Sequence, residues 1–139
     1  TTLFRSGCGN IGSAIAEGLK NSDKFSTNNI ILTRRKIHSL DKFEKNGFQI
    51  TKDNIDAVKK SELVIIAVGP SQIIPLLDNI KSHLTKNHLI ISIVSGVTIQ
   101  VIKDTIGGEI PIIRAMPNTA ASLCESMTCL STIPEFETK

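Results

Sequence analysis

Short apolar runs alternate along the chain with stretches in which apolar residues recur every three or four positions. The runs 63–68 and 89–94 are apolar at nearly every position. Strands of this kind are typical of parallel sheets that are covered by helices on both sides. The alternation of such strands with amphipathic helices predicts an α/β fold of Rossmann type, with a doubly wound, mainly parallel sheet and helices on both faces.

The individual elements follow from the same pattern. The expected strands are 3–6, 30–34, 48–50, 63–68, 89–94, 112–116 and a late edge strand at 126–130. Apolar stripes at helical spacing predict helices within 11–20, 40–47, 55–58, 73–84 and 99–106. Glycines end the second and the last of these helices, as they commonly do.

Composition narrows the class of protein. The chain has 139 residues, of which 40% are hydrophobic and 21% charged, and we expect one globular domain over 1–139. The net charge is +3, but no basic cluster is interleaved with aromatic residues, so no nucleic-acid partner is expected. We expect no membrane span, because no apolar run approaches the length that one requires. Without a visible export signal, the expected location is the cytoplasm.

The residues that commonly bind metals suggest no metal site. Three cysteines without paired spacing indicate small buried side chains rather than a disulfide framework or a zinc site: Cys8, Cys124 and Cys129. The three histidines, His38, His83 and His88, lie in helical or loop contexts and are expected at the surface.

A glycine-rich segment between the first strand and the first helix matches the pattern G-x-G-x-x-G. It consists of Gly7, Cys8, Gly9, Asn10, Ile11 and Gly12. In the dinucleotide fingerprint, the first glycine allows a tight turn and the second lets the backbone approach a pyrophosphate. The third glycine allows close packing of the helix, whose N-terminus faces the phosphates. The alternative interpretation is an ordinary glycine-rich turn.

The tip of the second strand indicates which dinucleotide is bound. Enzymes that use NAD usually have an acidic residue there, which binds the ribose 2′-OH. This chain has Thr33, Arg34 and Arg35 and no carboxylate. Because arginine can bind a 2′-phosphate through charge-assisted hydrogen bonds, NADP(H) is favoured, with NAD(H) as the alternative cofactor. The competing interpretation is a solvated basic loop.

Four segments in order carry a family resemblance. They are 7–16 (GCGNIGSAIA), 67–70 (AVGP), 92–99 (SIVSGVTI) and 114–121 (RAMPNTAA). The chain resembles pyrroline-5-carboxylate reductase over about 7–130. The resemblance implies NAD(P)H-dependent reduction of the C=N bond of 1-pyrroline-5-carboxylate to L-proline, the last step of proline biosynthesis.

The same resemblance implies how the domains are organised. A Rossmann domain is followed in this family by an all-helical domain, which builds the dimer and much of the substrate pocket. The chain is therefore expected to be the cofactor-binding part of a homo-oligomeric enzyme, without the helical domain and inactive when isolated.

Site residues are implied by position in the resemblance. Thr33, Arg34 and Arg35 are expected at the adenosine ribose and Asn54 near the adenine end. Ala67, Val68, Gly69 and Pro70 are expected along the cofactor. Ile93, Val94 and Ser95 are expected towards the nicotinamide. Met116, Pro117 and Asn118 are expected where nicotinamide and imine meet. Two departures from the family are the glycine at 69, where a lysine is usual, and the polar Arg5 and Ser6 in the first strand.

The chemistry demands little from protein side chains. The nicotinamide supplies the hydride, and the protein orients it against the imine carbon. No catalytic acid is identified, although Glu125 follows the Asn118 loop closely. Two alternatives to the leading interpretation are a related NADP-dependent reductase of another small substrate and a non-catalytic module that senses NADPH or docks a partner.

Overall fold

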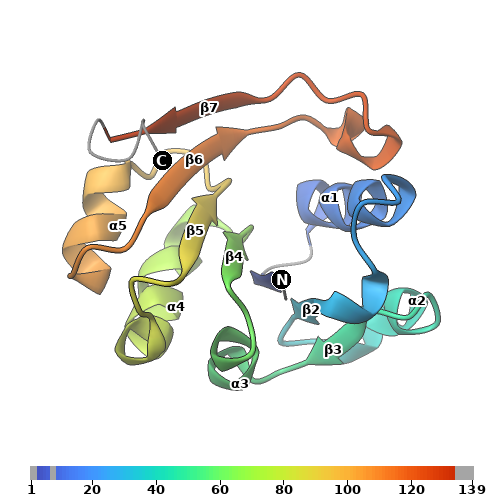
Figure 1. Ribbon diagram of the computed structural model, residues 1–139, viewed down its shortest axis with the longest axis horizontal. Coiled ribbons are helices and arrows are strands. Elements are labelled where there is room, and N and C mark those ends of the chain that lie inside the picture. The colour runs from blue at the N-terminus through green and yellow to red at the C-terminus, as the bar shows by residue number, and fades with distance from the viewer. Residues whose placement is uncertain (1–2, 7–8, 134–139) are drawn as a thin grey trace.

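The computed structural model describes residues 3–6 and 9–133. They form a seven-stranded sheet in the order β3-β2-β1-β4-β5-β6-β7 (Figure 1). All neighbouring strands are parallel except β6 and β7. The strands are β1 (Leu3–Ser6), β2 (Ile30–Thr33), β3 (Gln49–Thr51), β4 (Leu63–Ile66), β5 (Leu89–Ser92), β6 (Ile112–Met116) and β7 (Cys129–Thr132). The doubly wound sheet predicted from the sequence is confirmed.

The strands differ from their expected bounds at the ends. β2, β4 and β5 stop one or two residues earlier than expected, where the chain turns into loops. β3 begins and ends one residue later, because the backbone N–H of Phe48 donates to the carbonyl of Phe43 (3.1 Å) in the turn after α2. The late strand also begins later than expected, since Ser126 accepts a hydrogen bond from the backbone N–H of Asn118 (3.0 Å) within the preceding loop.

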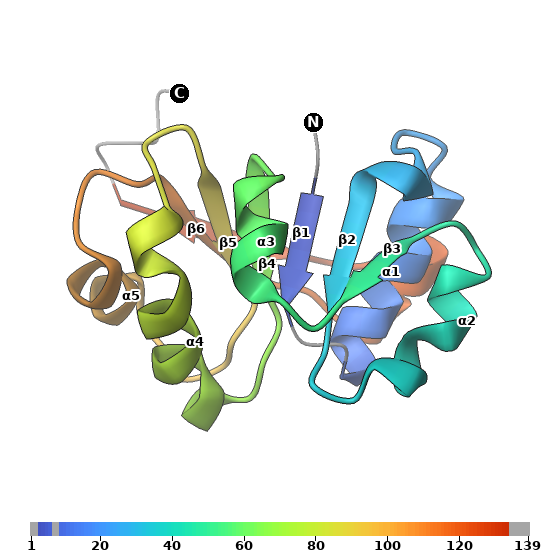
Figure 2. The ribbon, with the colours of Figure 1, turned by 90° about the horizontal axis from the view of Figure 1, so that it is seen from below.

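Helices cover both faces of the sheet. The α-helices are α1 (Asn10–Asn21), α2 (Asp41–Glu44), α3 (Asn54–Lys59), α4 (Ile73–Ile80) and α5 (Ile99–Ile106). Short 3-10 turns are η1 (Thr27–Asn29), η2 (Ile37–Leu40), η3 (Pro70–Gln72), η4 (Lys81–His83) and η5 (Thr119–Leu123). Figure 2 shows α3, α4 and α5 along one face. The expected helix at 73–84 is α4 followed by η4 rather than one continuous α-helix. In the part of the chain that the structure describes, no helix has the length and apolar character needed to cross a membrane.

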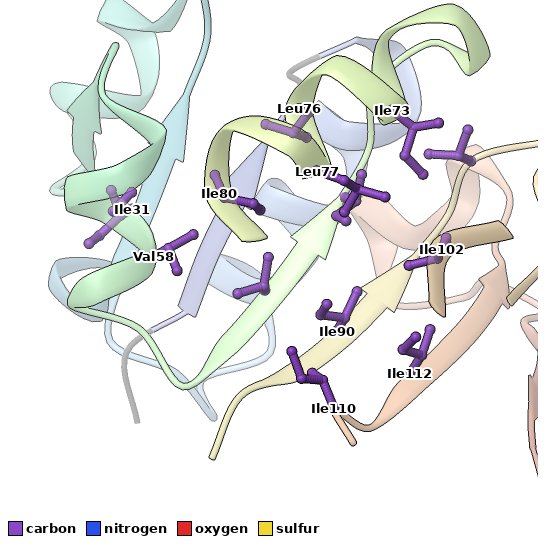
Figure 3. Packing of buried hydrophobic residues seen from close by; sticks show 14 residues of the cluster. Ile31, Val58, Ile73, Leu76, Leu77, Ile80, Ile90, Ile102, Ile110 and Ile112 are labelled. Carbon is purple, nitrogen blue, oxygen red and sulfur yellow. The ribbon is translucent and has the colours of Figure 1, made fainter. Parts of the chain in front are cut away.

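Apolar clusters lie on both sides of the sheet. The cluster beneath α3, α4 and α5 includes Leu77, Ile90, Ile102 and Ile112, whose side chains are essentially inaccessible to solvent (Figure 3). The cluster beneath α1 and α2 includes Leu32, Leu40 and Phe43. Burying each such side chain contributes about 1.5–3 kcal/mol relative to exposure. The central strands therefore need apolar residues on both faces, which is the pattern of the sequence.

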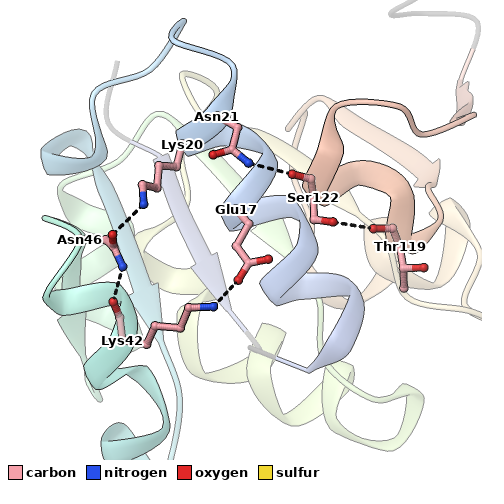
Figure 4. A network of polar contacts seen from close by, with 7 residues as sticks. All are labelled: Glu17, Lys20, Asn21, Lys42, Asn46, Thr119 and Ser122. Carbon is pink, nitrogen blue, oxygen red and sulfur yellow. Dashed lines mark hydrogen bonds and ion pairs between the residues drawn. The ribbon is translucent and has the colours of Figure 1, made fainter.

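The C-terminal half of α1 is attached to elements on both sides. Lys42 on α2 forms an ion pair with Glu17 (2.8 Å), and Asn21 donates a hydrogen bond to the carbonyl of Ser122 in η5 (3.0 Å; Figure 4). Gly18 lies at the contact with η5, and its carbonyl accepts a hydrogen bond from the Cys124 thiol (3.3 Å). A Cβ at position 18 would overlap the carbonyl oxygen of Ala121 and lie 3.0 Å from its carbonyl carbon.

Replacing Gly18 by alanine should destabilise the fold by about 1–3 kcal/mol, because η5 must move away from α1. Alanine favours a helix by about 1 kcal/mol more than glycine does. A stabilised variant would therefore show that η5 moves away from α1 at little cost in free energy. Urea unfolding monitored by circular dichroism measures the difference. Gly69→Ala is the control, since a Cβ there meets only Gln72 Oε1, at 3.8 Å.

Two expectations about titratable and thiol side chains are wrong. His88 is buried rather than at the surface, because Nδ1 accepts from the N–H of Thr85 (2.9 Å) and Nε2 donates to the carbonyl of Val58 (3.3 Å). Cys124 and Cys129 are exposed rather than buried, since η5 and the edge strand β7 place them on the surface. Cys8 lies outside the described residues.

Candidate functional site

A cavity of about 630 Å³ opens at the carboxyl ends of the central strands. It lies where the strand order reverses between β1 and β4, the usual ligand position in open α/β sheets. Its walls come from the N-cap of α1, the segments that follow β2, β3 and β4, the turn η3 and one side of α4. The lining residues are Gly9, Thr33, Arg34, Arg35, Lys36, Lys52, Asn54, Ala67, Val68, Gly69, Ser71, Gln72, Pro75, Leu76 and Asn79.

Gly9 forms the floor of this cavity next to the N-terminus of α1. Its φ of −78° and ψ of −170° are accessible to any residue, and its carbonyl accepts from the N–H of Ser13 (2.8 Å). A Cβ built on Gly9 meets no heavy atom within 4 Å. The missing side chain therefore leaves space on the cavity side, where an anionic group can approach the helix N-terminus.

A hydrogen bond connects the ends of β2 and α3. The hydroxyl of Thr33, the last residue of β2, donates to Oδ1 of Asn54 at 2.7 Å. Thr33 is buried, with 2% of its surface exposed, and Asn54 is the first residue of α3. The bond fixes the amide of Asn54 at the cavity wall.

Four cations line the cavity at one end: Arg34, Arg35, Lys36 and Lys52. Among residues 3–6 and 9–133, no acidic residue lines it and none of these cations takes part in an ion pair. Only the two arginines were predicted from the sequence to bind the cofactor. Lys52 was missed because the parallel pairing of β3 with β2, which brings it to the same edge of the sheet, is a property of the folded chain.

The wall formed by α4 was also missed. α4 contributes Pro75, Leu76 and Asn79, and the preceding turn η3 contributes Ser71 and Gln72. Gln72 Oε1 accepts weakly from the backbone N–H of Gly69 (3.4 Å), so the β4–α4 loop is partly held by its own helix. The sequence pattern of α4 marks only the stripe that faces the core, whereas the cavity is reached from another side of the helix.

The residues expected at the nicotinamide end do not line this cavity. The side chains of Ile93 and Val94 are buried in the apolar clusters, whereas Ser95 is exposed. Asn118 caps η5, where Oδ1 accepts from the N–H of Ala120 (3.0 Å), and Met116 is 40% exposed. These residues lie at or just beyond the carboxyl ends of β5 and β6, on the same edge of the sheet as the cavity.

Several other expected residues do not line the cavity. Asn10, Ile11 and Gly12 form the first turn of α1, and Pro70 begins η3. Gly7 and Cys8 lie outside the described residues. Glu125 is exposed. Across residues 9–133, no group of three or more acidic, histidine or cysteine side chains is placed to hold a metal ion.

Comparison with known proteins agrees with this geometry. A family model described as "NADP oxidoreductase coenzyme F420-dependent" matches residues 4–96. The chain is 47% identical over 125 residues to pyrroline-5-carboxylate reductase 1 of Dictyostelium discoideum, covering 90% of this chain and 23% of that protein.

Solved structures show the same arrangement. A pyrroline-5-carboxylate reductase from Coxiella burnetii superimposes with a TM-score of 0.89 at 34% identity, over 99% of this chain and 51% of that chain. The Plasmodium falciparum pyrroline carboxylate reductase with NADP bound has a TM-score of 0.87 at 24% identity, over 99% and 50%. The chain thus spans about half of these proteins. The expected resemblance and the Rossmann fold are confirmed.

Proposed function

We propose that this chain, which belongs to the family described as "NADP oxidoreductase coenzyme F420-dependent", is the NADP(H)-binding domain of a pyrroline-5-carboxylate reductase. The enzyme would reduce the C=N bond of 1-pyrroline-5-carboxylate to give L-proline. The proposal that the chain binds NADP(H) rests on the cavity where the strand order reverses. At the tip of β2 this cavity is lined by cations and by no carboxylate. The substrate rests on the relatives' names.

The residues of the cavity fit a dinucleotide. The volume of about 630 Å³ lies in the range of small-molecule and cofactor sites. The space above Gly9 would receive the pyrophosphate beside the N-terminus of α1. Arg34 and Arg35 would hold the 2′-phosphate, and Asn54, fixed by Thr33, would border the adenosine.

The other half of the cofactor would extend along the same edge of the sheet. The bound nicotinamide supplies the hydride to the imine carbon. The backbone of Ile93, Val94 and Ser95 would orient the ring, because the first two side chains are buried in the core. Met116, Pro117 and Asn118 would border the small-molecule substrate. We further propose that the whole enzyme is a cytoplasmic homo-oligomer.

A chimera tests the function. Residues 9–133 would replace the matching part of the Coxiella burnetii enzyme, which is 34% identical. The chimera should oxidise NADPH, followed by absorbance, only when 1-pyrroline-5-carboxylate is present, and should release proline. A folded chimera that binds NADPH but does not form proline would contradict the proposed substrate. We expect no turnover from the 139 residues alone, because the residues of the nicotinamide end are not enclosed and the imine would not be held in position.

Introducing a lysine at Gly69 should tighten NADPH binding by about three- to tenfold at low salt, and less at high salt. Gly69 lines the cavity, has a φ of −65° and has room for a Cβ, so a lysine there needs no backbone change. Calorimetric titration at two ionic strengths measures the effect. Gly69→Gln is the uncharged control, and equal affinities for both variants would show that the charge does not reach the cofactor.

A further inference from the structure

We propose that Lys52 is a second cation for the 2′-phosphate of NADP(H), on the neighbouring strand end to Arg34, and therefore a determinant of cofactor specificity. The inference rests on the proposed NADP(H) function and assigns a further residue to it. Lys52 does not belong to the glycine loop or to the tip of β2, and it comes from a different turn of the chain.

The sheet register places the two cations side by side. β2 and β3 are parallel, and Thr33 is the register partner of Thr51 at the last position of each strand. Arg34 and Lys52 are the next residues along each chain, and both line the cavity. Since neighbouring strands lie about 4.8 Å apart, the two side chains start from adjacent points on its rim.

The backbone at Lys52 is held from both sides. The N–H of Asp53 donates to the hydroxyl of Thr51 (3.1 Å). Asp53 Oδ1 in turn accepts from the N–H groups of Ile55 (2.9 Å) and Asp56 (3.1 Å) as the N-cap of α3. The start of the Lys52 side chain is therefore fixed, while the side chain itself is exposed.

The acidic residues near Lys52 are engaged elsewhere. The carboxylate of Asp53 caps α3, and that of Asp56 forms an ion pair with Lys60 at 2.7 Å. The cations that line this end of the cavity consequently share it without a carboxylate among the described lining residues. A phosphate, with a charge of about −1.5 to −2, would relieve this repulsion, whereas the neutral 2′-OH of NAD(H) would not.

The order of the strands distinguishes the 2′-phosphate from the pyrophosphate. The pyrophosphate is expected at Gly9, which follows β1, and β3 lies on the far side of β2 from β1. Two strand spacings, about 10 Å, therefore separate the end of β3 from the end of β1. The adenosine ribose of a bound dinucleotide lies at the tip of β2, so its 2′ position is the phosphate within reach of Lys52.

The test compares Lys52→Gln with Lys86→Gln, which removes the same charge from an exposed position before β5, at the amino ends of the parallel strands and so away from the cavity. NADPH and NADH would be titrated calorimetrically into the 139-residue chain and both variants. For Lys52→Gln we expect NADPH affinity to fall about tenfold, NADH affinity to stay within about twofold, and the salt dependence of NADPH binding to decrease. Lys86→Gln should leave both affinities unchanged.

Other outcomes overturn the inference. An unchanged NADPH affinity in Lys52→Gln, or an equal loss for both cofactors, would show that Lys52 does not contact the 2′-phosphate. After such a failure for Lys52, a loss of NADPH affinity in Arg34→Ala would still support the proposed function. A chain that binds neither cofactor would overturn both proposals. The ratio of kcat/KM for NADPH and NADH in the chimera gives a second measurement, and it should fall about tenfold with Lys52→Gln.

Discussion

Replacing Gly9 by valine should reduce NADPH affinity by more than about a hundredfold, equivalent to about 2.7 kcal/mol. The branched side chain would project into the space above the N-terminus of α1, where a Cβ meets nothing within 4 Å. That space is where the pyrophosphate must approach the backbone N–H groups. The loss is expected for NADH as well, because both cofactors carry the same pyrophosphate.

The fold should survive this substitution. The backbone of Gly9 has φ −78°, which a valine adopts without strain, and no neighbouring atom must move. Far-ultraviolet circular dichroism and the melting temperature should therefore change little. Gly9→Ala forms the graded control with a smaller loss of affinity. A Gly9→Val chain that binds NADPH like the original would mean that the loop is an ordinary turn.

Removing the guanidinium of Arg34 should weaken NADPH binding by about ten- to a hundredfold, or about 1.5–3 kcal/mol. Arg34 follows directly after β2 and lines the cavity, with no acidic residue beside it there. A charge-assisted hydrogen bond to the 2′-phosphate is lost in Arg34→Ala, and NADH has no such group. Competitive titration of both cofactors with original and variant chains provides the measurement.

Arg34→Lys separates charge from geometry in this experiment. Lysine retains the charge but cannot make the paired hydrogen bonds of a guanidinium, so an intermediate affinity is expected. If the original chain bound NADPH and NADH equally well, the basic tip of β2 would be a solvated loop and the preference for NADP(H) would be wrong.

Local patterns in the chain were enough to predict the sheet and half of the site. Runs such as 63–68 are apolar at every position, and only strands buried on both faces need such runs. The glycine loop and the basic tip of β2 are contiguous segments, so their place at a strand end follows from the chain itself. Gly9, Thr33, Arg34 and Arg35 accordingly line one cavity, and so does Asn54, which was expected there only from the family resemblance.

Other features depend on segments that meet only in the folded chain. Gly18 is an ordinary helix position in the sequence, but it lies against η5, whose residues follow about a hundred positions later. His88 is buried because a carbonyl from α3 accepts its hydrogen bond, thirty residues away. Periodicity along a single element carries no information about such partners.

The sequence by itself determined the order of strands and helices, the position of the glycine loop and the charge at the tip of β2. Each of these depends on residues within one element and its flanking turn. Only the tertiary structure decided that Lys52 lies beside Arg34 and that α4 supplies a cavity wall. The physical reason is strand register, since parallel pairing brings the ends of β2 and β3 together although eighteen residues separate Thr33 from Thr51.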